Sequence, residues 1–259
     1  MENIKWTTVS CGIAAAVSYF LTPVVRKLAI KQGVVDDPNQ DDRRVHTEPT
    51  PRWGGLAIYA ALVVSTIITM LIAQRQAGAY MWGILLVSSI LMIVGALDDL
   101  YQYKAKVQAL VLLLAGVAVQ FFDDGGKNAR VHIYGFDNPF SGNYVHLIWL
   151  GVPLTAIYIF VVTKTMDTID GIDGLTAGIA TIAAGTLSLI AVYEGQGRVA
   201  IMTAATCGAA LGFLRHNYNP AKIFMGTGGA YVLGFTLACL SVVGTLKKLR
   251  PRGPYLCHS

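Results

Sequence analysis

Three aspartates recur at three-residue spacing in the second half of the chain, at Asp167, Asp170 and Asp173. In helical geometry this spacing places the side chains on one face. Proteins usually hold Mg²⁺ through one or two carboxylates plus substrate phosphates, and Gly171 and Gly174 would let the backbone approach such a ligand. The structural alternative, in which Asp173 caps a following helix, accounts for one carboxylate of the three. The pattern therefore favours a divalent-cation site.

A second acidic feature is the adjacent pair Asp98 and Asp99, which follows a long apolar stretch. Two neighbouring carboxylates repel each other, and a helix C-terminus adds partial negative charge. One interpretation is a solvated helix end. The functional interpretation is that a cation or a basic partner offsets the repulsion, and Lys104 and Lys106 are close enough in sequence to contribute.

Two further polar segments could handle phosphate. The loop at residues 33–55 combines carboxylates with His46, Arg52 and other arginines, whose forked guanidinium groups match phosphate oxygens. The segment 215–222 ends in Lys222 and leads into the glycine cluster 226–229, and a helix that begins there can present N–H groups to phosphate. The alternatives are a polar connector with topology-setting charges for the first segment, and glycines that serve helix packing for the second.

The elements that must position these residues are apolar. The 259 residues are 54% hydrophobic and 14% charged, with a mean hydropathy of +0.53, whereas soluble domains carry about 25% charged residues. This composition excludes an ordinary soluble enzyme. Apolar stretches long enough to cross about 30 Å of hydrocarbon predict helical spans, which lie at residues 6–25, 53–73, 76–97, 107–122, 138–163, 174–193, 199–214 and 223–246.

The predicted fold is thus an all-α, polytopic bundle of about eight spans. Residues 1–246 form one transmembrane domain, and 247–259 form a basic, irregular tail. The loops 26–52, 98–106, 164–173 and 215–222 hold 11 Lys and Arg residues, against 5 on the opposite side before residue 247. By the positive-inside rule these loops are cytoplasmic and the N-terminus is outside. The net charge of +5 is thus a topology signal, and we expect no nucleic-acid partner.

The acidic residues cluster on the same side as the basic ones. Ten of the fifteen Asp and Glu residues lie in the predicted cytoplasmic loops. Because acidic residues contribute little to membrane orientation, this clustering needs a separate cause. A cation site or a phosphate-handling site is that cause, and we expect Asp98, Asp99, Asp170 and Asp173 to converge around one cation.

Together the four polar segments resemble the polyprenyl-phosphate N-acetylhexosamine-1-phosphate transferase family, which includes the phospho-MurNAc-pentapeptide translocases. The resemblance runs from about residue 33 to 244. In the first loop it rests on Asp36 or Asp37, Pro38, Arg43, His46, Pro49, Pro51, Arg52, Gly54 and Gly55. Further matches are the pair Asp98-Asp99, the run Asp170-Gly171-Ile172-Asp173-Gly174-Leu175, and the run Asn219-Pro220-Ala221-Lys222-Ile223-Phe224-Met225-Gly226.

The resemblance implies transfer of a sugar 1-phosphate, N-acetylglucosamine 1-phosphate in our expectation, from a UDP-sugar to polyprenyl phosphate with release of UMP. It implies Mg²⁺, a cytoplasmic site in a bacterial plasma membrane, and a homodimer as an open possibility. Asp98 would be the base towards the lipid phosphate. The other expected roles are catalysis by Asp99 and Asp173, metal binding by Asp99, Asp170, Asp173 and Asp167, and substrate binding by His46, Arg52, Lys106 and Lys222.

The sequence departs from the family pattern at three positions. Lys164 and Asp167 stand where the family has asparagines, and Thr227 replaces an aspartate that contributes to the metal. Asp167 could supply the missing carboxylate. A catalytically impaired paralogue that binds nucleotide sugar or lipid phosphate is one alternative. An ion-coupled transporter is another, because intramembrane carboxylates mark ion pathways, although these carboxylates lie at loop ends.

The final segment also departs from the family, which continues with further spans and a His-rich loop. Eight spans would place the tail outside, where four cations within six residues contradict the positive-inside bias. The expectation from the sequence is an incomplete form of a longer protein with weak or no activity. The alternatives are a naturally short member of the family or a miscounted span.

Overall fold

The computed structural model describes residues 2–36, 50–123, 130–137, 144–147 and 149–244. Within them lie the helices α1 (Glu2–Lys31), α2 (Gly54–Ile72), α3 (Ala79–Tyr101), α4 (Ala105–Ala118), α5 (Gly151–Ile169), α6 (Leu175–Tyr193), α7 (Gly197–Asn217) and α8 (Gly226–Gly244). A 3₁₀ turn, η2 (Val119–Phe121), continues α4. Two antiparallel pairs of short strands complete the fold, namely β1 (Val35–Asp36) with β2 (Thr50–Pro51), and β3 (Gly135–Asp137) with β4 (Tyr144–His146).

Seven of these helices, all except α4, are long and apolar enough to cross a membrane. The remaining apolar helix, at Ala105–Phe121, would extend about 25 Å at 1.5 Å per residue, slightly less than the hydrocarbon core. The all-α, polytopic fold predicted from the sequence is therefore confirmed. The predicted fourth span is present as a short helix, and the basic tail at 247–259 lies outside the described residues.

Several predicted boundaries differ from the observed ones, and two of these differences have a clear physical cause. Helix α1 continues to Lys31, six residues beyond the predicted apolar stretch, and carries exposed Lys27 and Lys31 on its last turns. Exposed charges do not end a helix that has already left the hydrocarbon. The prediction of a span that begins at residue 138 was wrong, because Tyr144–His146 pair with β3 and α5 begins only at Gly151. The lack of charge in that segment reflects a strand connection, not a helix.

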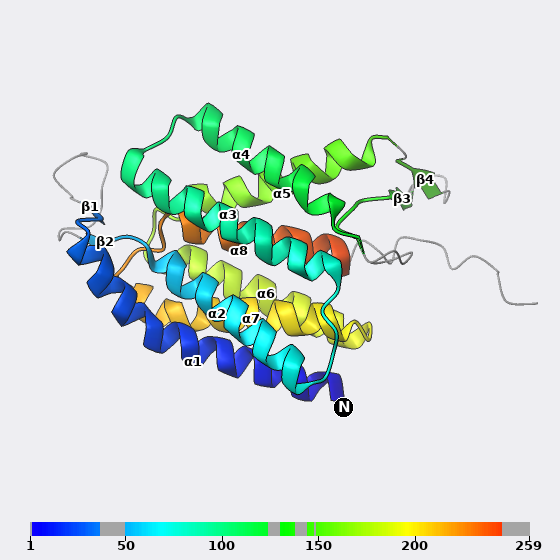
Figure 1. The fold of residues 1–259 in the computed structure, drawn as a ribbon, viewed down its shortest axis with the longest axis horizontal. Helices are drawn as coiled ribbons and strands as arrows, with labels where there is room; N and C mark the ends of the chain where they lie inside the picture. Colours follow the sequence, from blue (N-terminus) through cyan, green and yellow to red (C-terminus); the bar gives the residue numbers. More distant parts are fainter. Residues whose placement is uncertain (1, 37–49, 124–129, 138–143, 148, 245–259) are drawn as a thin grey trace, which may run out of the picture.

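Successive helices run in opposite directions, so their connections alternate between the two ends of the bundle (Figure 1). The end that carries β1 and β2 gathers the C-termini of α1, α3, α5 and α7 and the N-termini of α2, α4, α6 and α8. The four predicted site loops therefore meet at one end of the molecule. The pair β3 and β4 lies at the opposite end.

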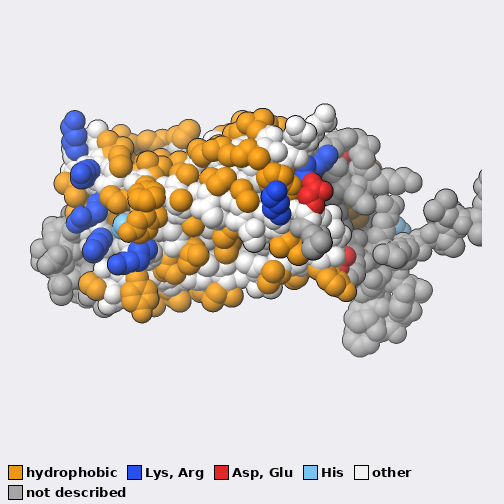
Figure 2. Space-filling model, turned by 90° about the horizontal axis from the view of Figure 1, so that it is seen from below, with side chains coloured by type: hydrophobic (Ala, Val, Ile, Leu, Met, Phe, Trp, Pro, Cys, Tyr) orange, Lys and Arg blue, Asp and Glu red, His pale blue; other side chains and the backbone are white. Residues whose placement is uncertain are grey.

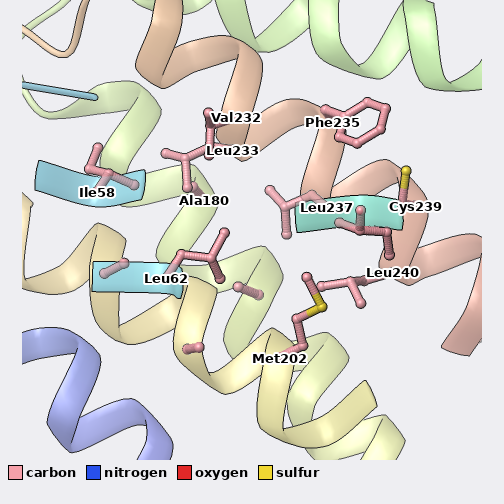
Figure 3. Packing of buried hydrophobic residues seen from close by; sticks show 14 of the residues in the cluster. Ile58, Leu62, Ala180, Met202, Val232, Leu233, Phe235, Leu237, Cys239 and Leu240 are labelled. Carbon is pink, nitrogen blue, oxygen red and sulfur yellow. The ribbon is translucent and has the colours of Figure 1, made fainter. Parts of the chain in front are cut away.

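Helix α8 forms the centre of the bundle and contacts α2, α3, α5, α6 and α7. Nearly all of its residues are buried, including Tyr231 and Phe235. Figure 3 shows its side chains packed towards Ile58 and Leu62 of α2 and Met202 of α7. Glycines let the backbones meet at its first turn, where a Cβ on Gly55 or Gly95 would overlap the α8 backbone at Gly229 or Gly228.

Apolar side chains cover the flank of the bundle, as expected for a lipid-facing surface. Figure 2 shows hydrophobic side chains along the middle of this face and Lys and Arg side chains towards both ends, with more of them at one end. Phe20 is 72% exposed, and Ile182 and Leu189 are each 73% exposed. Because α1 is basic and exposed at Arg26, Lys27 and Lys31, it contributes to the charged end. The hydrophobic belt and the polar ends fit a multi-pass membrane protein.

Close packing of α1 on α7 leads to a testable prediction. A Cβ at Gly208 would overlap the backbone carbonyl of Cys11, and one at Gly212 would overlap that of Ala15. We expect Gly208→Ala or Gly212→Ala to separate the two helices and to cost about 1–3 kcal/mol of stability, as overpacking does. The measurement is the thermal unfolding midpoint of the detergent-solubilised protein. Gly12→Ala, where no described atom lies within 4 Å of the added Cβ, should leave the midpoint unchanged.

Candidate active site

Asp99 lies at the end of α3, and its carboxylate meets the first turn of α8. Its Oδ1 accepts a hydrogen bond of 3.0 Å from the Thr227 backbone N–H, and the Arg52 Nη1 atom lies 4.0 Å from the same oxygen. The side chain is 1% exposed. Within the described part of the chain, Oδ2 is buried and has no hydrogen-bond partner. A carboxylate oxygen without a partner is costly, so this atom is prepared for a ligand.

Gly226 makes room for that carboxylate. It has a φ of +74°, a conformation that glycine adopts without strain. A Cβ at this position would overlap Asp99 Oδ2 and lie 3.1 Å from Asp99 Cγ. Because α8 begins here, its N-terminal partial positive charge also faces the carboxylate. Thr227, which replaces an aspartate of the family pattern, therefore contributes its backbone N–H to the site.

Asp98 is buried at 6% exposure and has a different environment from Asp99. Its Oδ1 accepts from the Tyr103 backbone N–H at 2.9 Å. The Gln108 amide nitrogen donates to both carboxylate oxygens, at 3.0 Å and 2.9 Å. Gln102 has a φ of +50°, so the chain turns sharply after α3 and brings Tyr103 back to the carboxylate. Asp98 thus accepts three hydrogen bonds, with both of its oxygens in contact with donors, whereas its neighbour Asp99 has one oxygen without a partner among the described residues.

Lys164 and Asp167 on α5 extend this arrangement. The Lys164 Nζ atom donates to Gln108 Oε1 at 2.9 Å and to Asp167 Oδ2 at 2.6 Å. Their side chains are 35% and 16% exposed. The two residues that replace asparagines of the family pattern therefore form an ion pair with each other. Asp167, predicted as a metal ligand, has one oxygen occupied by Lys164.

Asp170 follows α5 directly and lies among other charges. The pKa of its carboxyl group is raised to about 8, chiefly by burial and also by the neighbouring carboxylates of Asp167 and Asp99, while the Thr176 side chain and the charge of Arg52 act in the lowering direction. Asp170 is therefore close enough to Asp99 and Asp167 to interact with them electrostatically. A cation bound near this carboxylate would favour its charged form and lower this pKa.

Asp173 faces the connection between α7 and α8. Its Oδ2 accepts from Asn219 Nδ2 at 3.2 Å and from the Ala221 backbone N–H at 3.0 Å. Next to it, the Gly174 N–H donates to Asn217 Oδ1 at 3.1 Å, and Asn217 Nδ2 donates to the Ile223 carbonyl at 3.0 Å. Asp173 thereby fixes the connection between α7 and α8, which leads to Gly226 beside Asp99.

Arg52 links the first loop to the carboxylate cluster. Its Nη2 atom lies 2.9 Å from Asp36 Oδ2, so the guanidinium bridges Asp36 and Asp99. The backbone around it is held on both sides, because the Arg52 N–H donates to Val34 and the Phe224 N–H donates to Pro51. These bonds fix the position of Arg52 relative to the start of α8.

The other predicted substrate-binding residues have different surroundings. Lys106 and Lys222 are exposed at the site end of the bundle. The Lys222 carbonyl accepts a hydrogen bond of 2.9 Å from Arg26 Nε, which anchors its loop on α1. His46 lies outside the described residues.

Sequence reasoning gave no role to Gln108 or Asn217, and it named Asn219 only within a run that matches the family pattern. Gln108 could have been found, because it is an uncharged polar residue in an otherwise apolar stretch, and such residues face the interior of a bundle. Asn217, the last residue of α7, accepts from the Gly174 N–H, and Asn219 donates to Asp173; no local sequence pattern shows these contacts.

The arrangement suits a divalent cation held partly by substrate. Among the described residues, no three His, Cys, Asp or Glu side chains gather closely enough to hold a metal by themselves. Mg²⁺ does not require this, because it commonly takes one or two carboxylates and completes its shell with phosphates and water. The open Asp99 Oδ2 and the nearby Asp170 supply that number of hard oxygen ligands.

These features define a membrane-embedded helical protein with an acidic, phosphate-compatible site at one end of the bundle. The pattern of glycosyl transferase family 4 matches residues 81–245, and the chain belongs to this family. This confirms the resemblance that the sequence motifs indicated.

Individual relatives are similar over most of the chain. A probable undecaprenyl-phosphate N-acetylglucosaminyl 1-phosphate transferase of Bacillus subtilis (strain 168) is 35% identical over 229 residues, which cover 88% of this chain and 60% of the relative. A phospho-N-acetylmuramoyl-pentapeptide-transferase of Bacillus mycoides (strain KBAB4) is 34% identical over 91% of this chain and 74% of its own length. The corresponding protein of Bacillus cytotoxicus is 33% identical with the same coverage.

Proposed function

We propose that this protein transfers a sugar 1-phosphate from a UDP-sugar to polyprenyl phosphate and releases UMP. The observation that carries the proposal is that the adjacent carboxylates of Asp98 and Asp99 differ in their hydrogen bonding. One carboxylate is held by three donated hydrogen bonds, and its neighbour has an open oxygen at a helix N-terminus. The name of the B. subtilis relative specifies N-acetylglucosamine, and we propose this sugar for the donor of the present protein.

The proposed step is a displacement at phosphorus. An oxygen of the lipid phosphate forms a bond to the β-phosphorus of the UDP-sugar, and the bond from that phosphorus to the bridging oxygen breaks. UMP leaves with this oxygen. Asp98 accepts the proton of the attacking phosphate, since a carboxylate has about four lone-pair sites and three are used here. Positioning and charge compensation account for most of such catalysis.

Charge compensation is divided between a cation and basic side chains. We propose that Asp99 and Asp170 hold Mg²⁺, with Asp173 and Asp167 at the edge of the site. When bound, the ion would neutralise charge on the diphosphate. Arg52 lies beside Asp99 at 4.0 Å and would contact a phosphate oxygen, while Lys106, Lys222 and His46 would contact the substrates from the loops.

The proposed setting is the cytoplasmic face of a bacterial plasma membrane, where the product would feed cell-envelope glycan synthesis. A homodimer is compatible with this role, and a nucleic-acid partner is not part of it. The sidedness rests on the asymmetry of 11 basic residues against 5.

Sidedness has a direct test. A cysteine introduced at Lys104, in the connection from α3 to α4, should resist a membrane-impermeant thiol reagent added to intact cells and should react after permeabilisation. The matched control is a cysteine at Arg198, near the start of α7 at the opposite end, which should react in intact cells. The reverse pattern would invert the topology and place the site outside.

The activity test uses purified protein in membranes with radiolabelled donors. Mg²⁺-dependent transfer from UDP-N-acetylglucosamine to polyprenyl phosphate, with equal release of UMP, is the expected result. UDP-MurNAc-pentapeptide in parallel identifies the alternative sugar. Binding of a donor without UMP release would support the impaired paralogue, for which the pair Lys164 and Asp167 provides the motive. Ion flux without transfer would support a transporter.

The raised pKa of Asp170 predicts that cation binding depends on pH. Its pKa is about 8 without a cation, above the ordinary value of about 4. A metal must displace the proton. As the pH rises towards 8, the Mg²⁺ concentration for half-maximal thermal stabilisation should therefore fall by up to about tenfold per pH unit. Without Mg²⁺ the sign is opposite, because the folded state holds a proton that the unfolded state releases. Stability should then decrease between about pH 4 and 8.

Asp170→Asn is the control for this dependence. It should weaken the effect of Mg²⁺ and flatten its pH profile. Equal half-saturation at pH 6.5 and 7.5 in the unaltered protein would show that Asp170 does not bind the cation.

A further inference from the structure

A continuous row of polar side chains crosses three helices beside the site. It runs from Asp98 on α3 through Gln108 on α4 to Lys164 and Asp167 on α5. Each member contacts the next, at 2.9–3.0 Å from Gln108 to Asp98, 2.9 Å from Lys164 to Gln108, and 2.6 Å from Lys164 to Asp167. Helices separated in sequence thus converge on one carboxylate.

The charges of Asp98 and Lys164, on either side of Gln108, determine how the Gln108 amide is oriented. Its NH₂ group faces the carboxylate of Asp98, and its oxygen faces the ammonium group of Lys164. A flipped amide would place oxygen against a carboxylate and NH₂ against a cation, and both contacts would be repulsive. Lys164 is therefore the residue that keeps the donor side of Gln108 towards Asp98.

The geometry at Asp98 shows what this orientation achieves. The Gln108 nitrogen lies within 3.0 Å of both carboxylate oxygens, and the Tyr103 N–H fixes one of them from the backbone. Bonds to ionised acceptors are shorter and stronger than neutral ones. In a position that is 6% exposed, they restrict rotation of the carboxylate and leave one direction open for a proton donor.

The row also accounts for two departures from the family pattern. Lys164 and Asp167 both stand where the family has asparagines. Together they add one positive and one negative charge, and these charges contact each other. The two replacements therefore act as one unit and leave the net charge of the site unchanged.

We propose that Gln108 is a positioning residue for Asp98, and that Lys164, held by Asp167, acts on the site through Gln108. This proposal rests on the proposed function, in which Asp98 accepts a proton. Gln108 does not touch the reacting groups. Its removal should change the rate of the chemical step more than the binding of substrate, because a misplaced base acts after the complex has formed.

The test compares Gln108→Leu, Lys164→Met and the exchange of the two residues, Gln108→Lys with Lys164→Gln. Thr165→Val is the control, since Thr165 is exposed on the same helix as Lys164 and its hydroxyl donates to the Val161 carbonyl. We expect Gln108→Leu to lower kcat by about 10–100-fold with little change in KM for the UDP-sugar. Lys164→Met should have a smaller effect of the same kind.

The exchange variant separates positioning from simple packing. It keeps one ammonium group and one amide between the two carboxylates, with the ammonium now next to Asp98. We expect it to recover most of the kcat that either single variant loses. The proposal would be contradicted if this double variant had an unchanged unfolding midpoint but a kcat no higher than those of the single variants.

Hydrogen exchange provides a readout that does not need activity. The Tyr103 N–H is bonded to Asp98, so its exchange rate reports how firmly that carboxylate is held. Gln108→Leu and Lys164→Met should each accelerate exchange in the peptide that contains Tyr103, and Thr165→Val should not. Absence of transfer by the unaltered protein would contradict the proposed function. Independently of that result, an unchanged hydrogen-exchange rate at Tyr103 in both variants would contradict the positioning role of Gln108 and Lys164.

Discussion

We expect Asp98→Asn to lower sugar-phosphate transfer by about 10²–10⁴-fold, the range typical of a lost general base. The substitution should leave the fold intact, because an Asn oxygen can still accept from the Tyr103 N–H and the Gln108 amide. What it removes is the ability to take a proton from the lipid phosphate. The measurement is the rate of UMP release at saturating donor and lipid, together with the thermal unfolding midpoint.

Asp36→Asn is the matched control for this result. Asp36 is also a buried aspartate at the site end, but it contacts Arg52 at 2.9 Å and has no proposed part in the proton transfer. It should reduce activity far less than Asp98→Asn. If both variants lost activity equally, loss of local structure would be the better explanation. Full activity of Asp98→Asn would remove Asp98 from the proton transfer.

Gly226→Ala should reduce transfer by two orders of magnitude or more, although it adds a single methyl group. The methyl carbon would overlap Asp99 Oδ2 and would require φ near +74° in a residue that has a Cβ. Either Asp99 or the start of α8 must move, and a displacement of about 1 Å at a catalytic group can cost about 100-fold. Transfer activity and Mg²⁺-dependent stabilisation should both be lost.

The control for this glycine is Gly178→Ala, on α6. No described atom lies within 4 Å of its added Cβ, and alanine favours helix formation relative to glycine. Its activity should match that of the unaltered protein. Normal Mg²⁺ dependence in Gly226→Ala would mean that Asp99 Oδ2 does not face the cation.

The sequence was sufficient to predict most of the fold, because the bilayer imposes simple rules. Length, absence of charge and alternating connections predicted the helices and the end at which their loops meet. It failed before α5, where Tyr144–His146 pair with β3 and the helix begins only at Gly151, because a short strand without charges has the same composition as part of an apolar span. It also ended α1 too early, because charge marks the edge of the hydrocarbon and not the end of a helix.

The site was less accessible to sequence reasoning, because partners of a side chain depend on packing across helices. The motifs identified Asp98, Asp99 and Asp170 as candidates, and their roles remain predictions. Sequence alone could not show that Asp98 and Asp99 face different partners, nor that Lys164 contacts both Gln108 and Asp167. The opening beside Asp99 depends on Gly226, which lies 127 residues away in the chain.

The central position of α8 has a consequence for biogenesis. Helices leave the ribosome in order, and α8 must enter a slot whose walls, α2, α3, α5, α6 and α7, are synthesised before it. Until α8 packs against α3, Asp99 has neither the Thr227 N–H as a donor nor Gly226 beside its carboxylate. The nascent chain therefore occupies the membrane as a scaffold without a working site. We therefore expect the arrangement around Asp99 to form only after α8 has packed between the helices synthesised before it.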